Sequence, residues 1–392
     1  MKLRTKELLD YTLGGLLMAL LKVPTYCLGL ILRRNHELVL RGRVAFIKLA
    51  GGGSLVMAYP SLLGLRLAHR DCHFVLITTP SVAPFASLLQ VFDRVHVVDD
   101  RNIVTLLHSG INALRETYKF DTIIDLEAYG RLTTIFSLFT FARNRVSFFL
   151  ESAFWRRKIS THLIFFNRFS PTYRFYDQLC AIYNVPPATV EQCRVKLLGE
   201  NGLTAASAHS ASSPSSAPRR IGLGHACSAL ARERMLTAEQ WVSFLGARYA
   251  PETPLELHFF GVASDLAAAD DISQAVTAHF SNVSLVKHCG LALTESVRLI
   301  CSMDEFWGID SALIHLSRLL GIATTSFWGP TDPACRLRPI AGLKEVVFYE
   351  KIPCSPCVHV ASMPPCRGNN LCMKNLTRAP ADKVTNSPWL TH

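Results

Sequence analysis

Charged residues are scarce in this sequence: they make up 18% of its 392 positions, whereas hydrophobic residues make up 49%. This composition excludes a chain that is disordered throughout, because such chains combine low hydrophobicity with high charge. No strand-like run leads into a Gly-x-Gly-x-x-Gly motif, which argues against a dinucleotide-binding oxidoreductase. The first residues also lack a small-residue cleavage site after a short apolar core, which argues against a cleaved signal peptide.

Acidic residues are fewer than basic ones: 30 Asp and Glu stand against 41 Lys and Arg, and the formal net charge is +11. This balance favours an anionic partner, such as phospholipid, a phosphorylated glycan, a nucleotide or nucleic acid. Arg and Lys alternate with Phe and Trp over residues 143–158. That pattern fits an RNA-binding patch or a plain solvated face. Because no single-strand-binding signature follows, we expect no nucleic acid partner and favour an acceptor phosphate or a lipid headgroup.

Residues 11–32 form an almost uncharged stretch that would span about 33 Å as one helix, enough for a bilayer core. Lys22 and Pro24 lie in its middle, where a lysine costs about 2.5–3.5 kcal/mol on insertion scales. We therefore expect residues 1–38 to lie in one leaflet as two apolar half-segments bent at Lys22 and Pro24, with basic residues at both ends contacting headgroups. A true span and a soluble helix are the alternatives. In the first two cases we expect the body of the protein to face the cytoplasm.

From residue 43 onward, short β-rich runs alternate with helical patterns of about a dozen residues, which predicts βαβ units and a parallel sheet. Residues 199–219 are rich in Ser, Ala and Pro, a composition typical of flexible linkers. The same alternation resumes after them, so a ligand would bind beyond the carboxyl ends of the strands. We expect a membrane-associating segment (1–38), a first Rossmann-like domain (39–198), the linker (199–219), a second Rossmann-like domain (220–352) and a Cys-rich tail (353–392).

The stretch 308–333 is the most informative one. Asp310 and Ser311 precede a helical pattern that contains His315, and an apolar strand then ends in Gly-Pro-Thr-Asp-Pro. A helix start offers free N–H groups and the positive end of the helix dipole, which suits a diphosphate. Taken alone, Asp310 is more simply an N-cap and His315 a hydrogen-bond partner inside the core.

This stretch resembles the nucleotide-binding motif of glycosyltransferase family nine, the heptosyltransferases. Asp310, Ser311, His315 and Thr331 match that motif, and Ala312 stands where the family usually has Gly. Segments 47–62, 120–137, 225–241 and 256–265 resemble four further motifs in the family's order.

The resemblance implies the GT-B architecture, in which two Rossmann-like domains face each other across a cleft. It also implies transfer of a sugar, with inversion and without a catalytic metal, from a nucleotide-diphosphate sugar to a membrane-associated glycolipid or glycan. ADP-heptose and a lipopolysaccharide-type acceptor are the substrates that the family suggests. The resemblance also implies a place at the cytoplasmic face of a bacterial inner membrane.

The resemblance also assigns roles to residues. Basic and hydroxyl groups in the 225–241 loop would contact the diphosphate and so replace a divalent cation, and an acidic residue after the next strand would hold the ribose. On the acceptor side, a glycine run lets the backbone approach the sugar closely. The residues concerned are Ser228, Arg232, Arg234 and Asp265 for the nucleotide, and Gly51, Gly52, Gly53 and Arg131 for the sugar and acceptor. A basic helix entry and a surface carboxylate are the plainer interpretations of the first group.

Ser54 is the departure that matters most, because the family has at this position an Asp that resembles the general base. Three interpretations stay open. Glu127, at a strand end, could act as the base. Ser54 could position the substrate while phosphate oxygens assist. Catalysis could also be lost, which would leave a silent protein that binds nucleotide sugars or glycans.

Four of the twelve cysteines lie within nineteen residues, namely Cys354, Cys357, Cys366 and Cys372. Their number and spacing fit a structural zinc knuckle, and a cytoplasmic chain favours zinc over disulfides. Free thiols and disulfides are the alternatives. The remaining cysteines occur mostly in apolar runs, where they act as small buried hydrophobes.

Overall fold

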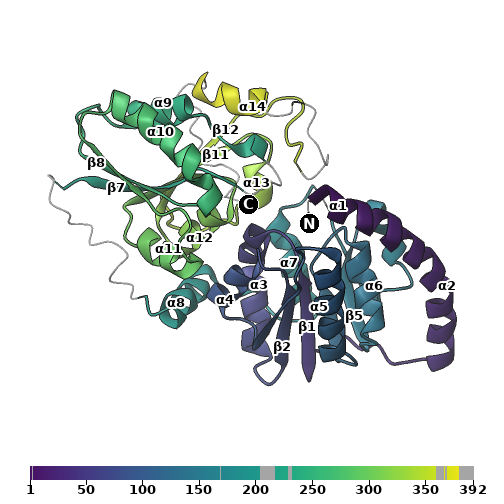
Figure 1. Ribbon diagram of the computed structural model, residues 1–392. Helices are drawn as coiled ribbons and strands as arrows, with labels where there is room; N and C mark the ends of the chain where they lie inside the picture. Colours follow the sequence, from purple (N-terminus) through teal and green to yellow (C-terminus); the bar gives the residue numbers. More distant parts are fainter. Residues whose placement is uncertain are drawn as a thin grey trace. The chain divides into compact units, whose positions relative to one another are not determined.

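The computed structural model describes residues 1, 3–167, 169–203, 217–227, 232–358, 366 and 369–378 (Figure 1). The chain divides into two compact units, Met1–Thr189 and Val190–His392. The division precedes the expected boundary at residue 198, because helix α8 (Val190–Glu200) packs within unit 2, where Arg194 Nε donates to the carbonyl of Leu319 at 3.2 Å. Of the expected linker, residues 204–216 lie outside the described residues.

Unit 1 is built on a six-stranded parallel sheet with the order β3-β2-β1-β4-β5-β6. Its strands are β1 (Arg43–Lys48), β2 (His73–Thr78), β3 (Arg94–Val97), β4 (Thr122–Asp125), β5 (Asn144–Phe149) and β6 (His162–Phe165). Strands β1, β2 and β4 are buried over nearly their whole length, as continuous apolar runs in a sheet covered on both faces require. The strand order reverses between β1 and β4, which is where doubly wound sheets bind ligands.

Helices cover both faces of this sheet. They are α3 (Gly52–Ala68), α4 (Ala83–Leu89), α5 (Ile103–Glu116), α6 (Arg131–Phe139) and α7 (Thr172–Ala181), with a 3₁₀ helix, η2, at Glu151–Arg156. Helices α3 and α4 follow strands that step in one direction, and α5 and α6 follow strands that step in the other. Right-handed crossovers therefore place α5 and α6 together on one face.

The N-terminal segment forms one continuous helical arm: α1 (Leu3–Leu9), a π-helical turn at Asp10–Gly14, and α2 (Gly15–Leu32). It is long and apolar enough to cross a membrane, by length and composition. The helix runs through Pro24 without interruption, and in Figure 1 the end of α2 turns away from the direction of α1. A proline removes one N–H bond from the ladder, which bends a helix without ending it.

Unit 2 has a second six-stranded parallel sheet, with the order β12-β11-β10-β7-β8-β9. Its strands are β7 (Arg219–Gly224), β8 (Leu255–Phe259), β9 (Val283–Lys287), β10 (Glu305–Ile309), β11 (Ala323–Trp328) and β12 (Glu345–Tyr349). Its helices are α9 (Ala238–Arg248), α10 (Leu266–His279), α11 (Leu293–Ile300), α12 (Ala312–Leu320), α13 (Pro333–Arg336) and α14 (Leu371–Lys374), with 3₁₀ turns η4 (Arg232–Arg234), η5 (Ala263–Asp265) and η6 (Asn375–Arg378). Thr237 caps α9 in a capping box with Gln240.

The basic patch expected at residues 143–158 is not wholly a surface. Arg156 is fully buried and Arg145 is half-buried, whereas Arg157 and Lys158 are exposed. Arg145 donates to the carbonyls of Ala142 and Ile159 at 3.1 and 3.0 Å, and burial lowers its pKa to about 10. Sequence alone does not separate an internal arginine from a solvated one, because the choice depends on which carbonyls the fold brings within reach.

Candidate functional site

Asp310 lies at the carboxyl end of β10, in the loop that starts α12. Its side chain is 5% exposed and stands between two bases. Arg234 Nη1 lies 3.5 Å from one carboxylate oxygen and donates to the Asp310 carbonyl at 2.9 Å. His315, one turn into α12, has Nε2 3.4 Å from the other carboxylate oxygen. The fold thus brings three of the predicted site residues into one buried cluster.

The charges of this cluster are fixed near neutral pH. Burial alone would raise the pKa of Asp310, but the charges of Arg234 and Arg336 and the hydrogen bond with His315 hold that pKa well below its ordinary value. Burial lowers the pKa of His315, against the opposing effect of Asp310. Asp310 is therefore a carboxylate and His315 a neutral imidazole. The anion keeps Arg234 in place at the start of α12.

Two hydroxyl groups beside this cluster are buried without hydrogen-bond partners among the described residues: Ser311 Oγ and Thr331 Oγ1. Ser311 is the N-cap residue of α12, yet its side chain makes no capping hydrogen bond. Thr331 follows β11, the neighbour of β10. A buried hydroxyl without a partner is unfavourable, so such groups mark a place where a ligand completes the hydrogen bonding. The free N–H groups of α12 add donors for an anion there.

His225 was missed by sequence reasoning, although the segment that contains it was singled out. It follows β7, next to β10 in the sheet, and its side chain is fully buried. Nε2 contacts the carbonyl of Asp265 at 3.2 Å, while Nδ1 has no partner among the described residues. The signal in the sequence was its place directly after a strand, at the same edge as Asp310.

The other residues predicted to bind the nucleotide differ in how they are placed. Arg232 is exposed at the start of η4, and Ser228 lies outside the described residues. Asp265 accepts a hydrogen bond from Val262 N–H at 2.9 Å, which closes the turn after β8 and leaves its second oxygen for a ligand. Ala312 is the first residue of α12, so its methyl group lies at the free N–H groups of the helix start. The family motif usually has glycine at this position, which carries no methyl group.

The loop after β11 is held from behind by the C-terminal part of the chain. The N–H groups of Cys357 and Val358 donate to the carbonyl of Pro330 at 3.0 and 3.1 Å, and Ser355 Oγ donates to the carbonyl of Gly329. A Cβ on Gly329 would lie 2.6 Å from Met373 Sδ. Only glycine lets the tail approach this closely, so the tail fixes the loop that carries Thr331.

The four tail cysteines differ in exposure: Cys354 is exposed, Cys357 and Cys366 are half-buried, and Cys372 is buried. Burial, followed by the negative charge of neighbouring thiolates, raises the pKa of Cys357, and the same causes raise that of Cys372 to about 11. The thiols are therefore close enough to interact. Among the described residues, however, no three His, Cys, Asp or Glu side chains are arranged to hold a metal ion. The zinc site stays a prediction.

In unit 1, Glu127 holds the turn that follows β1. Its Oε1 accepts from Leu49 N–H at 2.7 Å, Ala50 N–H at 2.9 Å and Lys48 Nζ at 3.0 Å. Burial alone would lower the pKa of Lys48, but the charge of Glu127 raises it above its ordinary value. Glu127 Oε2 makes no hydrogen bond within the described part of the chain. One oxygen is thus structural and the other is free to accept a proton or a substrate hydroxyl.

A second ion pair lies beneath Glu127. Arg156 Nη2 donates to Asp125 Oδ2 at 3.0 Å, and both side chains are buried. Arg156 also donates to the carbonyls of Glu127 and Phe148. Burial raises the pKa of Asp125 to about 6, although Arg156 and a hydrogen bond from Thr133 oppose the rise. This pair fixes the backbone on which Glu127 stands.

The glycine run shapes the start of α3. Gly51 has a φ of +80°, which favours glycine, and a Cβ on Gly52 would lie 2.2 Å from the ring of Phe85. Gly53 is half-exposed beside them. Ser54 is in the first turn of α3, where its N–H donates to the carbonyl of Gly51 at 2.9 Å. Its hydroxyl stands at a helix start, which suits an anion better than it suits proton abstraction.

Arg131 is used to hold the N-terminal arm. Its guanidinium lies over the ring of Trp155 at 4.0 Å and over that of Tyr11 at 4.7 Å. Its backbone N–H donates to the carboxylate of Asp10 at 2.9 Å. The side chain predicted to contact the acceptor therefore has an internal role in this structure.

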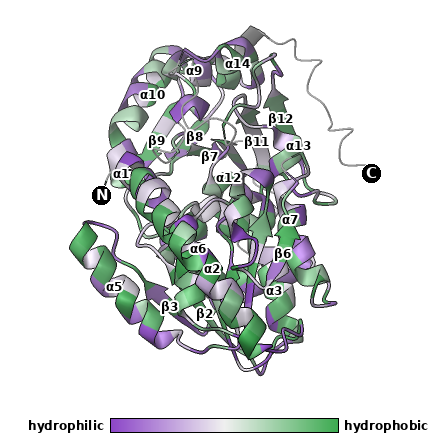
Figure 2. Cartoon of the chain, turned by 90° about the vertical axis from the view of Figure 1, so that its right-hand side faces the viewer, coloured by the Kyte–Doolittle hydropathy of each residue, from purple (hydrophilic) through white to green (hydrophobic). Residues whose placement is uncertain are grey.

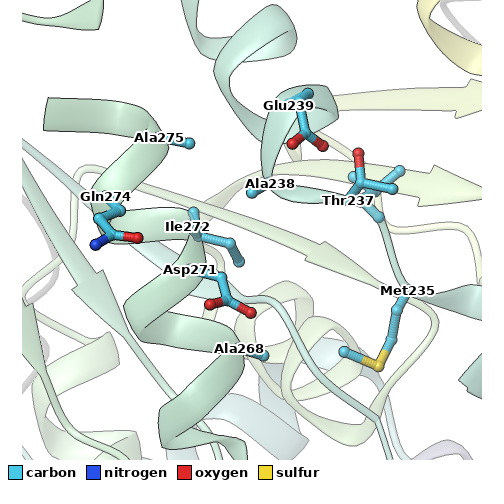
Figure 3. Close-up of a pocket in the computed structure, with 10 residues that line it drawn as sticks. Met235, Thr237, Ala238, Glu239, Ala268, Asp271, Ile272, Gln274 and Ala275 are labelled. Carbon is cyan, nitrogen blue, oxygen red and sulfur yellow. The ribbon is translucent and has the colours of Figure 1, made fainter. Parts of the chain in front are cut away.

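A surface pocket of about 750 Å³ lies beside α9 and α10 (Figure 3). Thr237 and Glu239 line it from the start of α9, and Asp271 and Gln274 from α10. None of the predicted site residues lines this pocket. The candidate site is instead at the carboxyl ends of β7, β8, β10 and β11.

Comparison with known families identifies part of the chain. Residues 247–366 match the model of glycosyltransferase family 9 (heptosyltransferase). This range contains segments 256–265 and 308–333, so the match confirms the resemblance of those two motifs. Segments 47–62, 120–137 and 225–241 lie wholly before residue 247, outside the match, so their resemblance stays a prediction. No protein of curated function matches the chain by sequence.

Solved structures share the two-domain fold over most of the chain. A family 9 glycosyltransferase from Veillonella parvula has a TM-score of 0.59 at 17% identity, over 79% of this chain and 86% of that one. E. coli heptosyltransferase WaaC with ADP has a TM-score of 0.57 at 15% identity, over 78% and 92%. E. coli ADP-heptose LPS heptosyltransferase II has a TM-score of 0.56 at 16% identity, over 79% and 91%. The predicted α/β fold with two Rossmann-like domains, the GT-B type, is confirmed.

Proposed function

We propose that this chain, whose second unit carries a glycosyltransferase family 9 match, transfers a sugar from a nucleotide-diphosphate donor to a hydroxyl group. The observation that carries the proposal is the pair of buried, unpartnered hydroxyls of Ser311 and Thr331 beside the start of α12. A diphosphate would accept from both hydroxyls and from the N–H groups of α12. An ADP-sugar is the first donor to consider, since WaaC was solved with ADP.

The proposed reaction is a single displacement. The acceptor oxygen forms a bond to the anomeric carbon as the bond from that carbon to the diphosphate oxygen breaks, and the configuration inverts. The electron pair leaves with the diphosphate, where Arg234 and the α12 dipole would stabilise it. The acceptor proton passes to a base.

Glu127 is our candidate for that base. Its Oε1 is held by Lys48 and two backbone N–H groups, and Oε2 is free to take a proton. Ser54, at the start of α3, would position the substrate. We propose a hydroxyl of a membrane-associated, anionic glycolipid or glycan as acceptor, which the net charge of +11 supports. A lipopolysaccharide-type acceptor and heptose as the donor sugar rest on the family match.

A second candidate is a catalytically silent protein that binds nucleotide sugars or glycans. The observation in its favour is Ser54, a residue that cannot remove a proton unaided at neutral pH. Both candidates predict nucleotide binding, and only the first predicts turnover.

The test is thermal stability of the purified chain with ADP, UDP, GDP or CMP. A ligand present at about 100 times its dissociation constant adds roughly 2.7 kcal/mol. We expect one nucleotide to stabilise the wild type but not a variant with Ser311→Ala and Thr331→Val. If none of the four nucleotides stabilises the wild type, the proposal of donor binding is refuted. Release of the matching nucleotide diphosphate from its sugar in the presence of acceptor then separates the transferase from the silent protein.

A further inference from the structure

The N-terminal arm is a docked part of unit 1. The carboxylate of Asp10 accepts from the N–H groups of Arg131 and Leu132 at 2.8–3.1 Å and so caps α6. Met18 packs with Ile135 and Ile159 in a small core. A Cβ on Gly14 would lie 2.8 Å from Arg131 Cβ, so the arm approaches α6 closely. A helix held along one side in this way cannot cross a membrane without leaving these contacts.

The opposite side of the arm is apolar and exposed. Between residues 11 and 32 the only charged residue is Lys22. Large hydrophobic side chains stay exposed along the whole length, for example Leu8 at 62%, Leu20 at 61%, Val23 at 67% and Ile31 at 76%. A surface of this length is far beyond the scattered exposed hydrophobic residues of ordinary soluble proteins.

Helix α5 carries a second exposed apolar stripe. Val104, Leu107 and Ile111 are 71%, 58% and 49% exposed, and their spacing places them on one side of the helix. The inward side of α5 packs on the sheet through Leu106 and Ala113. Both α5 and α6 cover the same face of the sheet, and the arm lies on α6. In Figure 2 the arm (α1 and α2) passes in front of the unit and α5 lies to its left, and both helices carry green segments.

Cations lie beside this face. Lys22 is 5.9 Å from the ring of the exposed Phe154, and Lys158 is 4.2 Å from the ring of Tyr26. Arg33 ends the arm and is exposed, and Arg34 holds the carbonyl of Phe141 at 3.3 Å. An exposed apolar side beside Lys and Arg is the pattern of a helix that lies in the plane of an anionic lipid surface.

We propose that unit 1 binds an anionic lipid bilayer through one face made of two parts, the N-terminal arm and the Val104–Leu107–Ile111 stripe of α5. The arm lies in one leaflet without crossing it, and the α5 stripe is the second contact. Anionic lipid strengthens binding by roughly fivefold for each cation that reaches the surface. This inference is independent of the proposed reaction, because it concerns a different surface.

The test is co-sedimentation of the full chain with vesicles of phosphatidylcholine alone or mixed with phosphatidylglycerol. We expect strong binding to the mixed vesicles only. Val104→Glu removes an apolar contact and adds a charge repelled by the lipid, so its partition coefficient should fall at least tenfold. Val195→Glu is the matched control: an exposed valine, 61%, on helix α8 of unit 2, whose substitution should change nothing. Circular dichroism and nucleotide-dependent stabilisation should be the same in both variants.

Three outcomes overturn the proposal. Binding of Val104→Glu equal to that of the control means that α5 is not part of the face. Retention of the wild type in membranes after carbonate extraction means that the arm spans the bilayer. The wild type could instead form dimers in sedimentation velocity, with Val104→Glu monomeric and no binding to vesicles. That result means that a second copy of the chain, and not lipid, covers this face. If nucleotide stabilises Val104→Glu and Val195→Glu equally, the donor site is intact in both variants, and the loss of vesicle binding is not caused by misfolding.

Discussion

Replacing Asp310 with Asn tests whether the buried cluster at the start of α12 is held by charge. The substitution keeps the size of the side chain and removes one negative charge. The ion pair between this carboxylate and Arg234, whose side chain is 14% exposed, is then lost. Removing one partner of a buried ion pair costs about 3–5 kcal/mol. In a unit of about 200 residues each kcal/mol shifts the melting temperature by about 2–4 °C, so we expect a fall of about 6–20 °C.

Tryptophan fluorescence is a suitable probe, because Trp241, Trp307 and Trp328 are all buried in unit 2. Asp332→Asn is the matched control. Asp332 caps α13 by accepting from Ala334 N–H at 2.9 Å, and Asn caps a helix about as well as Asp does. The control should therefore unfold within about 0.5 kcal/mol of the wild type. If the melting temperature of Asp310→Asn is no lower than that of Asp332→Asn, the cluster is not held by charge.

The pH dependence supplies a second check. The pKa of Asp310 is lower in the folded chain than its ordinary value of about 3.9. Its contribution to stability is therefore complete above about pH 4 and is lost as the pH falls further toward the folded pKa. The difference in melting temperature between wild type and Asp310→Asn should therefore shrink below about pH 4, as Asp310 of the wild type becomes protonated.

Three further predictions follow from the structure. Ser311→Ala with Thr331→Val should abolish nucleotide-dependent stabilisation yet leave the ligand-free melting temperature within about 2 °C, since neither hydroxyl has a hydrogen-bond partner among the described residues. Glu127→Gln should lower turnover by about 10²-fold or more with nucleotide affinity unchanged, if Glu127 is the base; equal turnover would exclude it. Elemental analysis should find about one zinc per chain, reduced by Cys354→Ser; a wild-type zinc content near zero would defeat the zinc hypothesis.

The alternation of apolar runs and helical patterns was enough to predict both parallel sheets. Strands such as β1 and β10 are buried on both sides, so their sequences read as unbroken apolar runs. The place of Asp310 followed from the same reasoning, because a residue directly after a buried strand and before a helix has few positions open to it.

Partners that come from distant parts of the chain could not be predicted. No local pattern indicated that Asp10, 121 residues away, accepts a hydrogen bond from the backbone N–H of Arg131. Arg156 was placed on a surface, although it pairs with Asp125 inside unit 1. The boundary at Thr189 depends on Arg194 reaching the carbonyl of Leu319, 125 residues later in the sequence. Each contact is decided by tertiary packing, which leaves no local pattern in the sequence.

The loop that carries Thr331 is held by residues made much later. The N–H groups of Cys357 and Val358 donate to the carbonyl of Pro330, and Gln240, in the first turn of α9, donates to the carbonyl of Met373 at 2.7 Å. A ribosome must therefore synthesise the chain past residue 373 before these contacts can form. A nascent chain that already contains Asp310 and α12 would still lack the support of that loop. Nucleotide binding could thus report that synthesis has passed this point, and premature termination before it would yield a fold without a finished site.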